Sequence, residues 1–192
     1  MLPQKQWYDS STADPEQVKQ LCREWNTNPY VAEILLRRGY KTREEIKSFL
    51  LPSLNNLRDP YELRQMREAV DLLQDTISKN RRIVILGDYD VDGITATALM
   101  LEFLHKCGNL DLDFFIPNRI KHGYGLTEAS TDILLEMRPE LVITVDNGIT
   151  AAREVQRLND VGINTIITDH HLADPGLLPS GIVVNPNHPE CK

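Results

Sequence analysis

The part of the chain after Arg81 alternates short runs rich in isoleucine and valine with longer stretches of helical character. The runs have no polar alternation, so each is expected to be a strand buried on both faces of a sheet. The expected strands are Ile83–Leu86, Leu112–Ile116, Leu141–Val145, Asn164–Thr168 and Gly181–Val184. The expected helices between them are Thr95–Cys107, Glu128–Met137 and Ala151–Asp160. This order predicts an α/β fold with a doubly wound, mainly parallel sheet.

The first 80 residues are polar and helical instead. Asp14 before Pro15 has the pattern of a helix N-cap, and Thr42 with Glu45 has that of a capping box. A third helix is expected to begin at Asp59. Its apolar side chains are spaced by three and four, which favours core packing over a partner site: Leu63, Met66, Val70, Leu73 and Ile77. We therefore expect a small helical N-terminal region, residues 1–80, before an α/β domain, residues 81–192.

Composition limits the classes of function. The 192 residues carry a net charge of -7, which argues against a passive coat on nucleic acid but not against a nuclease. Carboxylates that bind metal ions contribute to this negative net charge, but the bound cations offset their charge. The three scattered cysteines predict reduced thiols rather than disulfides or a zinc site. With no apolar signal core and no membrane-length apolar run, we expect a cytoplasmic protein without a membrane partner.

Acidic and imidazole side chains follow three of the expected strands. The first strand is followed by three aspartates, the third by one, and the fourth by an aspartate and two histidines: Asp88, Asp90, Asp92, Asp146, Asp169, His170 and His171. The carboxyl ends of parallel strands meet at one sheet edge, where ligands bind. Carboxylates gathered there would repel one another unless a divalent cation joined them. Oxygen and imidazole ligands suit Mn²⁺ or Mg²⁺, and two such ions could clamp a phosphoryl displacement.

Taken singly, each of these segments has a simpler interpretation. The run Asp88 to Gly93 resembles a calcium loop, but its twelfth position is Leu99 instead of the glutamate that an EF-hand needs. Asp92-Gly93 and Asp146-Asn147-Gly148 are also ordinary turn patterns. His170-His171 alone could be a structural pair. Their joint occurrence at three strand ends favours the metal site.

These segments resemble the first three motifs of the DHH phosphoesterase superfamily. The motifs are the run from Gly87 to Gly93, Asp146-Asn147-Gly148 and Asp169-His170-His171. Softer flanking segments resemble one branch of it, the RecJ family of 5′-to-3′ exonucleases specific for single-stranded DNA. These are Trp7 with the helical region, the stretch from Pro52 to Pro60, Gly123-Tyr124-Gly125-Leu126 and Val184-Asn185-Pro186.

The resemblance implies a role for each metal ligand. Asp90 and Asp92 would each bind one of two metal ions, Mn²⁺ or Mg²⁺. Asp146 would bridge the two ions, and His170 would complete the shell of one of them.

The resemblance also implies catalytic residues. His171 would face the scissile phosphate, and Asp88 would bind a metal through water or orient another ligand. The loop after the second strand supplies candidate substrate contacts from its own chemistry. Arg119 and Lys121 could hold phosphates and Tyr124 could stack on a base, although a solvated basic loop is the simpler alternative.

Two departures from the superfamily pattern qualify this interpretation. The fourth motif, which supplies another aspartate ligand, is absent, as are the DHH-associated domain and the OB-fold of the RecJ family. We therefore expect an N-terminal fragment with an incomplete metal site. Family II pyrophosphatases place a histidine four residues before the first metal aspartate, and here that position is Leu86, which argues against a pyrophosphatase.

Three functions follow as hypotheses. The first is a metal-dependent, single-stranded-DNA-specific 5′-3′ exonuclease of DNA repair and recombination, with proteins of replication and repair as partners. The second is a DHH phosphodiesterase of cyclic dinucleotides or short oligonucleotides. The third is a non-enzymatic replication scaffold, which the retained ligands disfavour.

Overall fold

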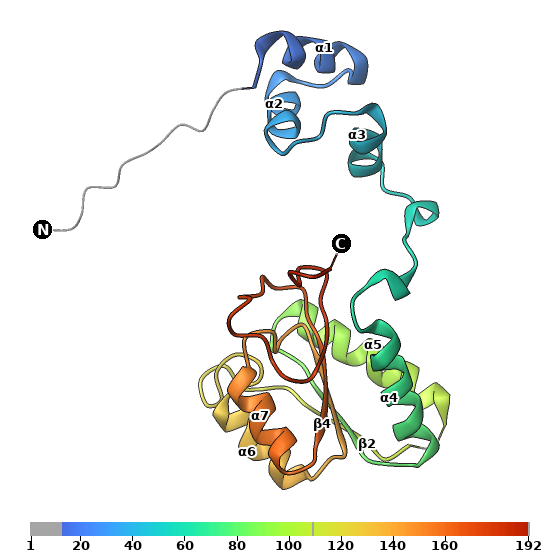
Figure 1. Ribbon diagram of the computed structural model, residues 1–192, viewed down its shortest axis with the longest axis vertical. Helices are drawn as coiled ribbons and strands as arrows, with labels where there is room; N and C mark the ends of the chain where they lie inside the picture. Colours follow the sequence, from blue (N-terminus) through green and yellow to red (C-terminus); the bar gives the residue numbers. More distant parts are fainter. Residues whose placement is uncertain (1–12, 109, 192) are drawn as a thin grey trace, which may run out of the picture. The chain divides into compact units, whose positions relative to one another are not determined.

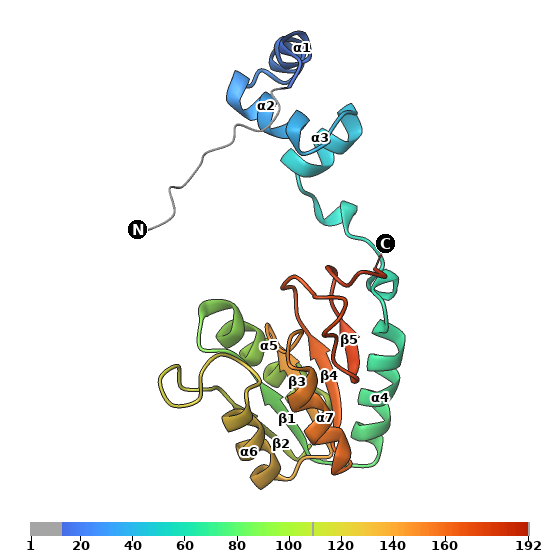
Figure 2. The same ribbon diagram turned by 60° about the vertical axis from the view of Figure 1, so that its left-hand side comes forward.

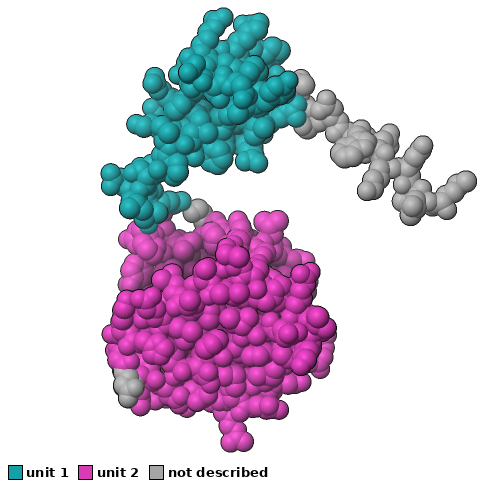
Figure 3. All heavy atoms as spheres, turned by 180° about the vertical axis from the view of Figure 1, so that it is seen from behind, with its two compact units in different colours: residues 1–58 teal, residues 59–192 magenta. Residues whose placement is uncertain are grey.

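The computed structural model describes residues 13–108 and 110–191, and the chain divides after Arg58 into two compact units (Figure 3). The first unit contains helices α1 (Pro15–Trp25), α2 (Pro29–Arg37) and α3 (Arg43–Leu50) and the short 3-10 helix η1 (Leu54–Asn56). Its small core consists of Leu21, Ala32, Leu35 and Ile46. The expected N-cap at Asp14 and the capping box of Thr42 and Glu45 are both present.

The second unit is built on five parallel strands in the order β2-β1-β3-β4-β5, which confirms the α/β class. The strands are β1 (Ile83–Leu86), β2 (Leu112–Phe115), β3 (Leu141–Val145), β4 (Asn164–Thr168) and β5 (Ile182–Val184). The helical elements are η2 (Pro60–Glu62), α4 (Met66–Ser78), α5 (Val91–Cys107), α6 (Glu128–Met137) and α7 (Ala152–Asp160). Within the described ranges, no helix is both long and apolar enough to cross a membrane.

Helices cover both faces of the sheet (Figures 1 and 2). Val84 and Leu86 of β1 point to one face and pack with side chains from α6 and α7. Ile83 and Ile85 point to the other face and pack with side chains from α4 and α5. Every residue of β1 and β3 is buried, as the continuous apolar runs predicted.

The chain reverses its direction of travel across the sheet between β1 and β3. From β1 it crosses through α5 to β2 at one edge, and then returns through α6 to β3 on the other side of β1. In open parallel sheets such a switch point opens a crevice at the carboxyl ends of the two strands, where ligands bind. The topology therefore places the ends of β1 and β3 at the expected ligand site.

The helix expected from Asp59 starts later than its sequence pattern indicated. Only η2 forms after Asp59, the backbone is extended at Leu63, and Gln65 adopts a left-handed conformation with φ 57° before α4 begins. In this position Gln65 Oε1 accepts a hydrogen bond from the Val183 amide at 3.0 Å. This long-range bond, which local sequence does not encode, accounts for the interruption. The regularly spaced apolar side chains of this helix pack in the core as expected, except that Ala69 and Leu72 pack there instead of Val70.

We expected residues 1–80 to form one helical region, but α4 belongs to the second unit. Its buried Ala69 contributes to the same cluster as Ile83 and Ile85 of β1. An amphipathic helix is stabilised mainly by the surface that its apolar face covers, and here that surface is the sheet.

Candidate metal centre

The three acidic segments lie at one edge of the sheet, as expected. Asp88 follows β1, Asp146 follows β3, and Asp169 follows β4, and these three strands are parallel neighbours in register. The first two segments flank the switch point. Segments that are distant in the chain are therefore brought together by strand pairing alone.

Helix α5 begins inside the first acidic segment, earlier than the expected Thr95. Asp90 is its N-cap, and Asp90 Oδ1 accepts a hydrogen bond from the Gly93 amide at 3.0 Å. Asp92 consequently lies in the first helical turn, at the end of the helix where the dipole stabilises negative charge. Gly93 is required here, because a Cβ on this residue would lie 2.5 Å from the Asp88 backbone nitrogen.

The acidic segment after β3 links the ends of β1 and β3 by hydrogen bonds. The amide nitrogen of the buried Asn147 side chain donates to the carbonyl oxygens of Leu86, at 3.2 Å, and Val145, at 2.9 Å. Asp146 itself has a left-handed backbone with φ 64°, a conformation that aspartate and asparagine tolerate better than most residues. The turn interpretation of this segment is therefore correct, and the turn holds the carboxylate of Asp146 at the site.

Asp169 organises the two histidines that follow it. Its Oδ1 accepts hydrogen bonds from the backbone amides of His170, at 2.7 Å, and His171, at 3.1 Å. The same oxygen lies 2.7 Å from His171 Nδ1, while Oδ2 accepts from the Ile149 amide at 2.9 Å. A carboxylate can only accept, so this contact keeps a proton on Nδ1 of His171. The hydrogen bond to Asp169 also raises the pKa of His171.

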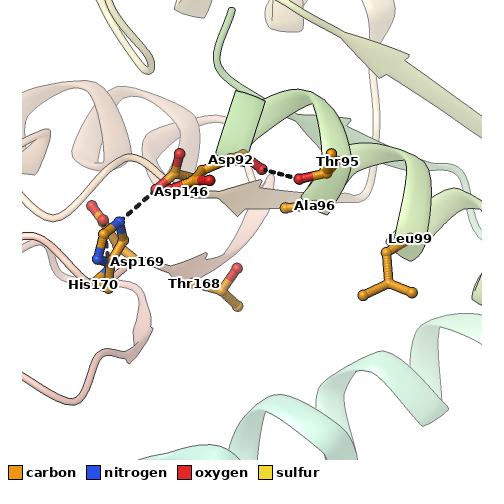
Figure 4. A pocket seen from close by; sticks show the side chains of 8 residues that line it. All are labelled: Asp92, Thr95, Ala96, Leu99, Asp146, Thr168, Asp169 and His170. Atoms are coloured by element: carbon orange, nitrogen blue, oxygen red, sulfur yellow. Dashed lines mark hydrogen bonds and ion pairs between the residues drawn. The ribbon is translucent and has the colours of Figure 1, made fainter. Parts of the chain in front are cut away.

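Asp146, His170 and His171 form a cluster that could bind a metal ion. One ligand atom from each lies within 4.8 Å of the others, and His170 Nε2 is 2.8 Å from Asp146 Oδ1. Beside them is an open hollow of about 520 Å³, on which Asp92 and Asp169 also border (Figure 4). Its opposite wall is the α5 surface formed by Thr95, Ala96 and Leu99.

The charges of this cluster fit a divalent cation. Asp88 is fully buried, and among the described residues neither of its carboxylate oxygens has a hydrogen-bond partner. Burial raises the pKa of Asp88, and burial together with the nearby charge of Asp90 raises the pKa of Asp146. Such shifts mean that each carboxylate is costly to ionise without a compensating positive charge. Oxygen and imidazole donors are the set that Mn²⁺ or Mg²⁺ would accept.

The buried Asp88 carboxylate predicts a pH-dependent stability. Because burial raises the pKa of Asp88, the folded state keeps this proton over a range in which the unfolded chain releases it. The free energy of unfolding therefore falls as the pH rises through that range. With a chelator present, Asp88→Asn should be more stable than the unchanged chain at pH 7. The two should converge below the unfolded pKa of about 3.9.

Urea denaturation across pH measures this difference. Asp71→Asn is the control, because Asp71 lies on the exposed side of α4. If Asp88→Asn gained no more stability at pH 7 than Asp71→Asn, the unfavourable burial of the charged form would be refuted.

The loop after β2 supplies one residue to the centre itself. Tyr124 Oη donates to the Asp146 carbonyl oxygen at 3.1 Å and lies 3.3 Å from His171 Nε2. The Arg119 guanidinium lies over the Tyr89 ring, 5.6 Å from its centroid, and the Tyr89 and Tyr124 rings meet edge to face at 6.1 Å. Lys121 lies on the exposed part of the loop. The structure thus brings Tyr124 to the centre and places Arg119 beside it.

Several residues of the centre had no individual role in the sequence interpretation. Asp169 and Asn147 belonged to the recognised motifs, but their hydrogen bonds depend on partners from other segments. Asn185 was expected only as part of a flanking stretch and Asn187 was not singled out, yet their side chains bond the backbone of the two histidines. Two asparagines separated by one residue follow a buried strand, and this was the sequence feature that could have indicated their role.

Comparison with known proteins shows the family of this chain. The sequence model of the DHH family, N-terminal domain, matches residues 82–192. The chain belongs to the DHH family. This match includes the whole candidate metal centre and all five strands of the sheet.

Two curated relatives of this DHH-family chain carry the name single-stranded-DNA-specific exonuclease RecJ. The relative from Bacillus subtilis is 38% identical over 191 residues, which is 100% of this chain and 24% of the relative. The relative from Escherichia coli is 31% identical and is matched over 85% of this chain and 28% of its own length. The chain thus spans about a quarter of the length of these relatives.

Two solved structures of RecJ are also similar to this chain. A crystal structure of exonuclease RecJ bound to manganese has a TM-score of 0.63 and 37% identity, over 71% of this chain and 35% of that one. RecJ from Thermus thermophilus in complex with Mn²⁺ has the same TM-score and 31% identity, over 95% of this chain and 25% of that one.

Proposed function

We propose that this chain carries the metal-binding part of a single-stranded-DNA-specific 5′-3′ exonuclease. The observation that carries the proposal is the cluster of Asp146, His170 and His171 at the switch point, beside the buried Asp88, whose carboxylate has no hydrogen-bond partner among the described residues. The shared name of the curated relatives supports the substrate, and the manganese in two related structures supports the cofactor.

In this proposal two cations, Mn²⁺ or Mg²⁺, would bind mainly to aspartate side chains. Asp90 and Asp92 would each hold one cation, Asp146 would be shared by the two, and His170 would complete the ligand set of one. When bound, the two cations would activate water at neutral pH and clamp the phosphoryl oxygens. The helix N-terminus at Asp90 and the left-handed turn at Asp146 hold their carboxylates before any ion arrives.

His171 acts on the phosphate side of the site. Its proton on Nδ1 is held by Asp169, and its Nε2 edge faces Tyr124 Oη. An imidazole whose pKa is raised in this way carries positive charge more readily, which suits a group that faces a phosphate. Asp88 would bind a metal through water or orient another ligand from its buried position.

The loop after β2 would hold the DNA strand. Arg119 and Lys121 contribute positive charge for phosphates, and the Tyr89 and Tyr124 rings offer aromatic edges and faces for bases. Stacking and phosphate contacts do not read sequence, so degradation would be independent of base order. We place this activity in the cytoplasm, in DNA repair and recombination, together with replication and repair proteins.

The test uses the chain itself and the full product of the gene that encodes it. Each is given Mn²⁺ or Mg²⁺ and labelled single-stranded DNA, the matching duplex or a cyclic dinucleotide. We expect the full product to release nucleotides from the 5′ end of the single strand and to leave the duplex intact.

Each alternative function predicts a different result in this assay. Cleavage of the cyclic dinucleotide with the single strand untouched would make the protein a phosphodiesterase of small nucleotides. No cleavage of any substrate by a protein that binds Mn²⁺ would favour a scaffold. Either outcome would refute the exonuclease.

A further inference from the structure

The segment after β5 bonds to the carbonyl oxygens of both histidines of the centre. The Asn185 side-chain amide donates to the His171 carbonyl oxygen at 3.0 Å, and the Asn187 side-chain amide donates to the His170 carbonyl oxygen. Within the described ranges no strand bonds to these two consecutive carbonyl groups, and each is held by an asparagine. No contact with the imidazole rings is involved, so these asparagines leave the ring nitrogens available to a ligand.

These bonds continue the sheet beyond the point where strand pairing stops. The pairing of β4 with β5 ends at Thr168 and Val184, followed by a bond from the Asp169 amide to the Val184 carbonyl oxygen at 3.2 Å. From there the backbone of the histidines leaves the sheet. The asparagine side chains replace the missing ladder bonds and so fix the path of the turn that carries both rings.

The segment is itself held by hydrogen bonds. Asn185 is fully buried, and its side-chain oxygen accepts from the Asn187 amide at 2.6 Å, which orients its amide nitrogen toward His171. The segment is anchored at both ends by the residues that precede α4. Gln65 accepts from the Val183 amide at 3.0 Å, and Arg64 pairs with Glu190 at 2.8 Å.

We propose that Asn185 and Asn187 are positioning residues: Asn187 sets the direction of the His170 imidazole toward the metal, and Asn185 sets the direction of the His171 imidazole toward the phosphate side of the site. This inference rests on the metal centre proposed above. A metal ligand must be held within about 0.5 Å of its productive position. The direction of a side chain follows from the backbone that carries it, so loosening a carbonyl group of this turn moves the ring.

The sharpest variant is Asn187→Ala. Asn187 is exposed, so its truncation removes the bond to His170 without opening the core. We expect the affinity of the chain for Mn²⁺, measured by calorimetric titration, to fall about tenfold, the lower end of the range for partners that orient metal ligands. The melting temperature of the metal-free chain should stay unchanged. Asn159→Ala, which removes only a 3.1 Å bond to Ser180 remote from the centre, should leave both quantities as they were.

A second measurement needs no metal. In the metal-free chain, the nuclear magnetic resonance shifts of the His170 ring nitrogens report its 2.8 Å contact with Asp146. We expect these shifts to move toward those of a free imidazole in Asn187→Ala, and to stay in place in Asn159→Ala. The His171 ring should change less, because Asp169 still contacts its Nδ1 and Asn185 still bonds the His171 carbonyl oxygen.

The two measurements separate failure of this inference from failure of the proposed function. A chain that binds no Mn²⁺ would refute the metal centre, while the ring shifts would still decide the positioning role. Unchanged ring shifts in Asn187→Ala, or an affinity within twofold of the unchanged chain, would overturn the positioning role. A loss of affinity that appears only with a lower melting temperature would show a purely structural contribution and would overturn it too.

Discussion

Replacing Asp146 by asparagine is expected to abolish Mn²⁺ binding by the chain and exonuclease activity of the full gene product. Asp146 contacts His170 and is the residue proposed to bridge both cations. Partners that only orient a metal ligand already change affinity by about 10–100-fold, so loss of a bridging carboxylate should cost more than about 100-fold. Calorimetric titration with MnCl₂ measures the first effect, and release of labelled nucleotides measures the second.

Asparagine is the informative replacement at this position. Asp146 has φ 64°, and asparagine tolerates that left-handed conformation, whereas alanine would add backbone strain to the loss of the ligand. The control is Asp132→Asn, which removes an exposed carboxylate that pairs with Arg157 at 2.8 Å. It should bind and cleave as before. Retention of full Mn²⁺ affinity by Asp146→Asn would contradict the bridging role.

The second large effect is expected from Gly93→Ala. A Cβ at residue 93 would lie 2.5 Å from the Asp88 nitrogen, 2.6 Å from its carbonyl oxygen and 2.7 Å from its Cα. All three are backbone atoms, so no side-chain rotation relieves the clash. Overpacking costs about 1–3 kcal/mol where a core can adjust, and we expect a loss of stability at or above the upper end of that range.

Urea denaturation measures the loss, and a second readout localises it. Since the clash would separate the β1 end from the start of α5, Mn²⁺ affinity should fall as well. Gly176→Ala is the matched control, because its Cβ would meet only Asp174 Oδ1 at an ordinary 3.5 Å and its φ lies outside the left-handed region. That variant should stay within about 0.5 kcal/mol of the unchanged chain. Equal effects of the two variants would refute the close contact between residue 93 and the Asp88 backbone.

The fold could be predicted because the sheet is buried on both faces. A strand that contacts helices on either side is mostly apolar, as β1 and β3 are, and the strands β1, β3 and β4 have the bounds that the sequence predicted. The residues at which helices begin were less predictable. The start of α5 at Val91 depends on the cap that Asp90 provides, and the start of α4 at Met66 depends on a bond between Gln65 and Val183.

The convergence of Asp88, Asp146 and Asp169 could likewise be inferred from sequence. Each follows a strand, and parallel strands end at a common edge, so pairing order was the only unknown. What could not be inferred is how each side chain is held. Asn147 bonds the end of β1 across 61 residues, and nothing local to Asn147 requires that partner.

The sequence by itself determined the class of fold, the edge at which the acidic segments meet and the family to which the chain belongs. These depend on apolar periodicity and on residue types at strand ends, which are local properties. Tertiary structure alone decided that Asp88 is buried without a partner in the described part of the chain and that Asp169 fixes the His171 proton. It alone also decided that Asn185 and Asn187 bond the backbone of the two histidines. The physical reason is that burial and hydrogen-bond partners are contributed by segments distant in the chain, and only folding brings them within bonding distance.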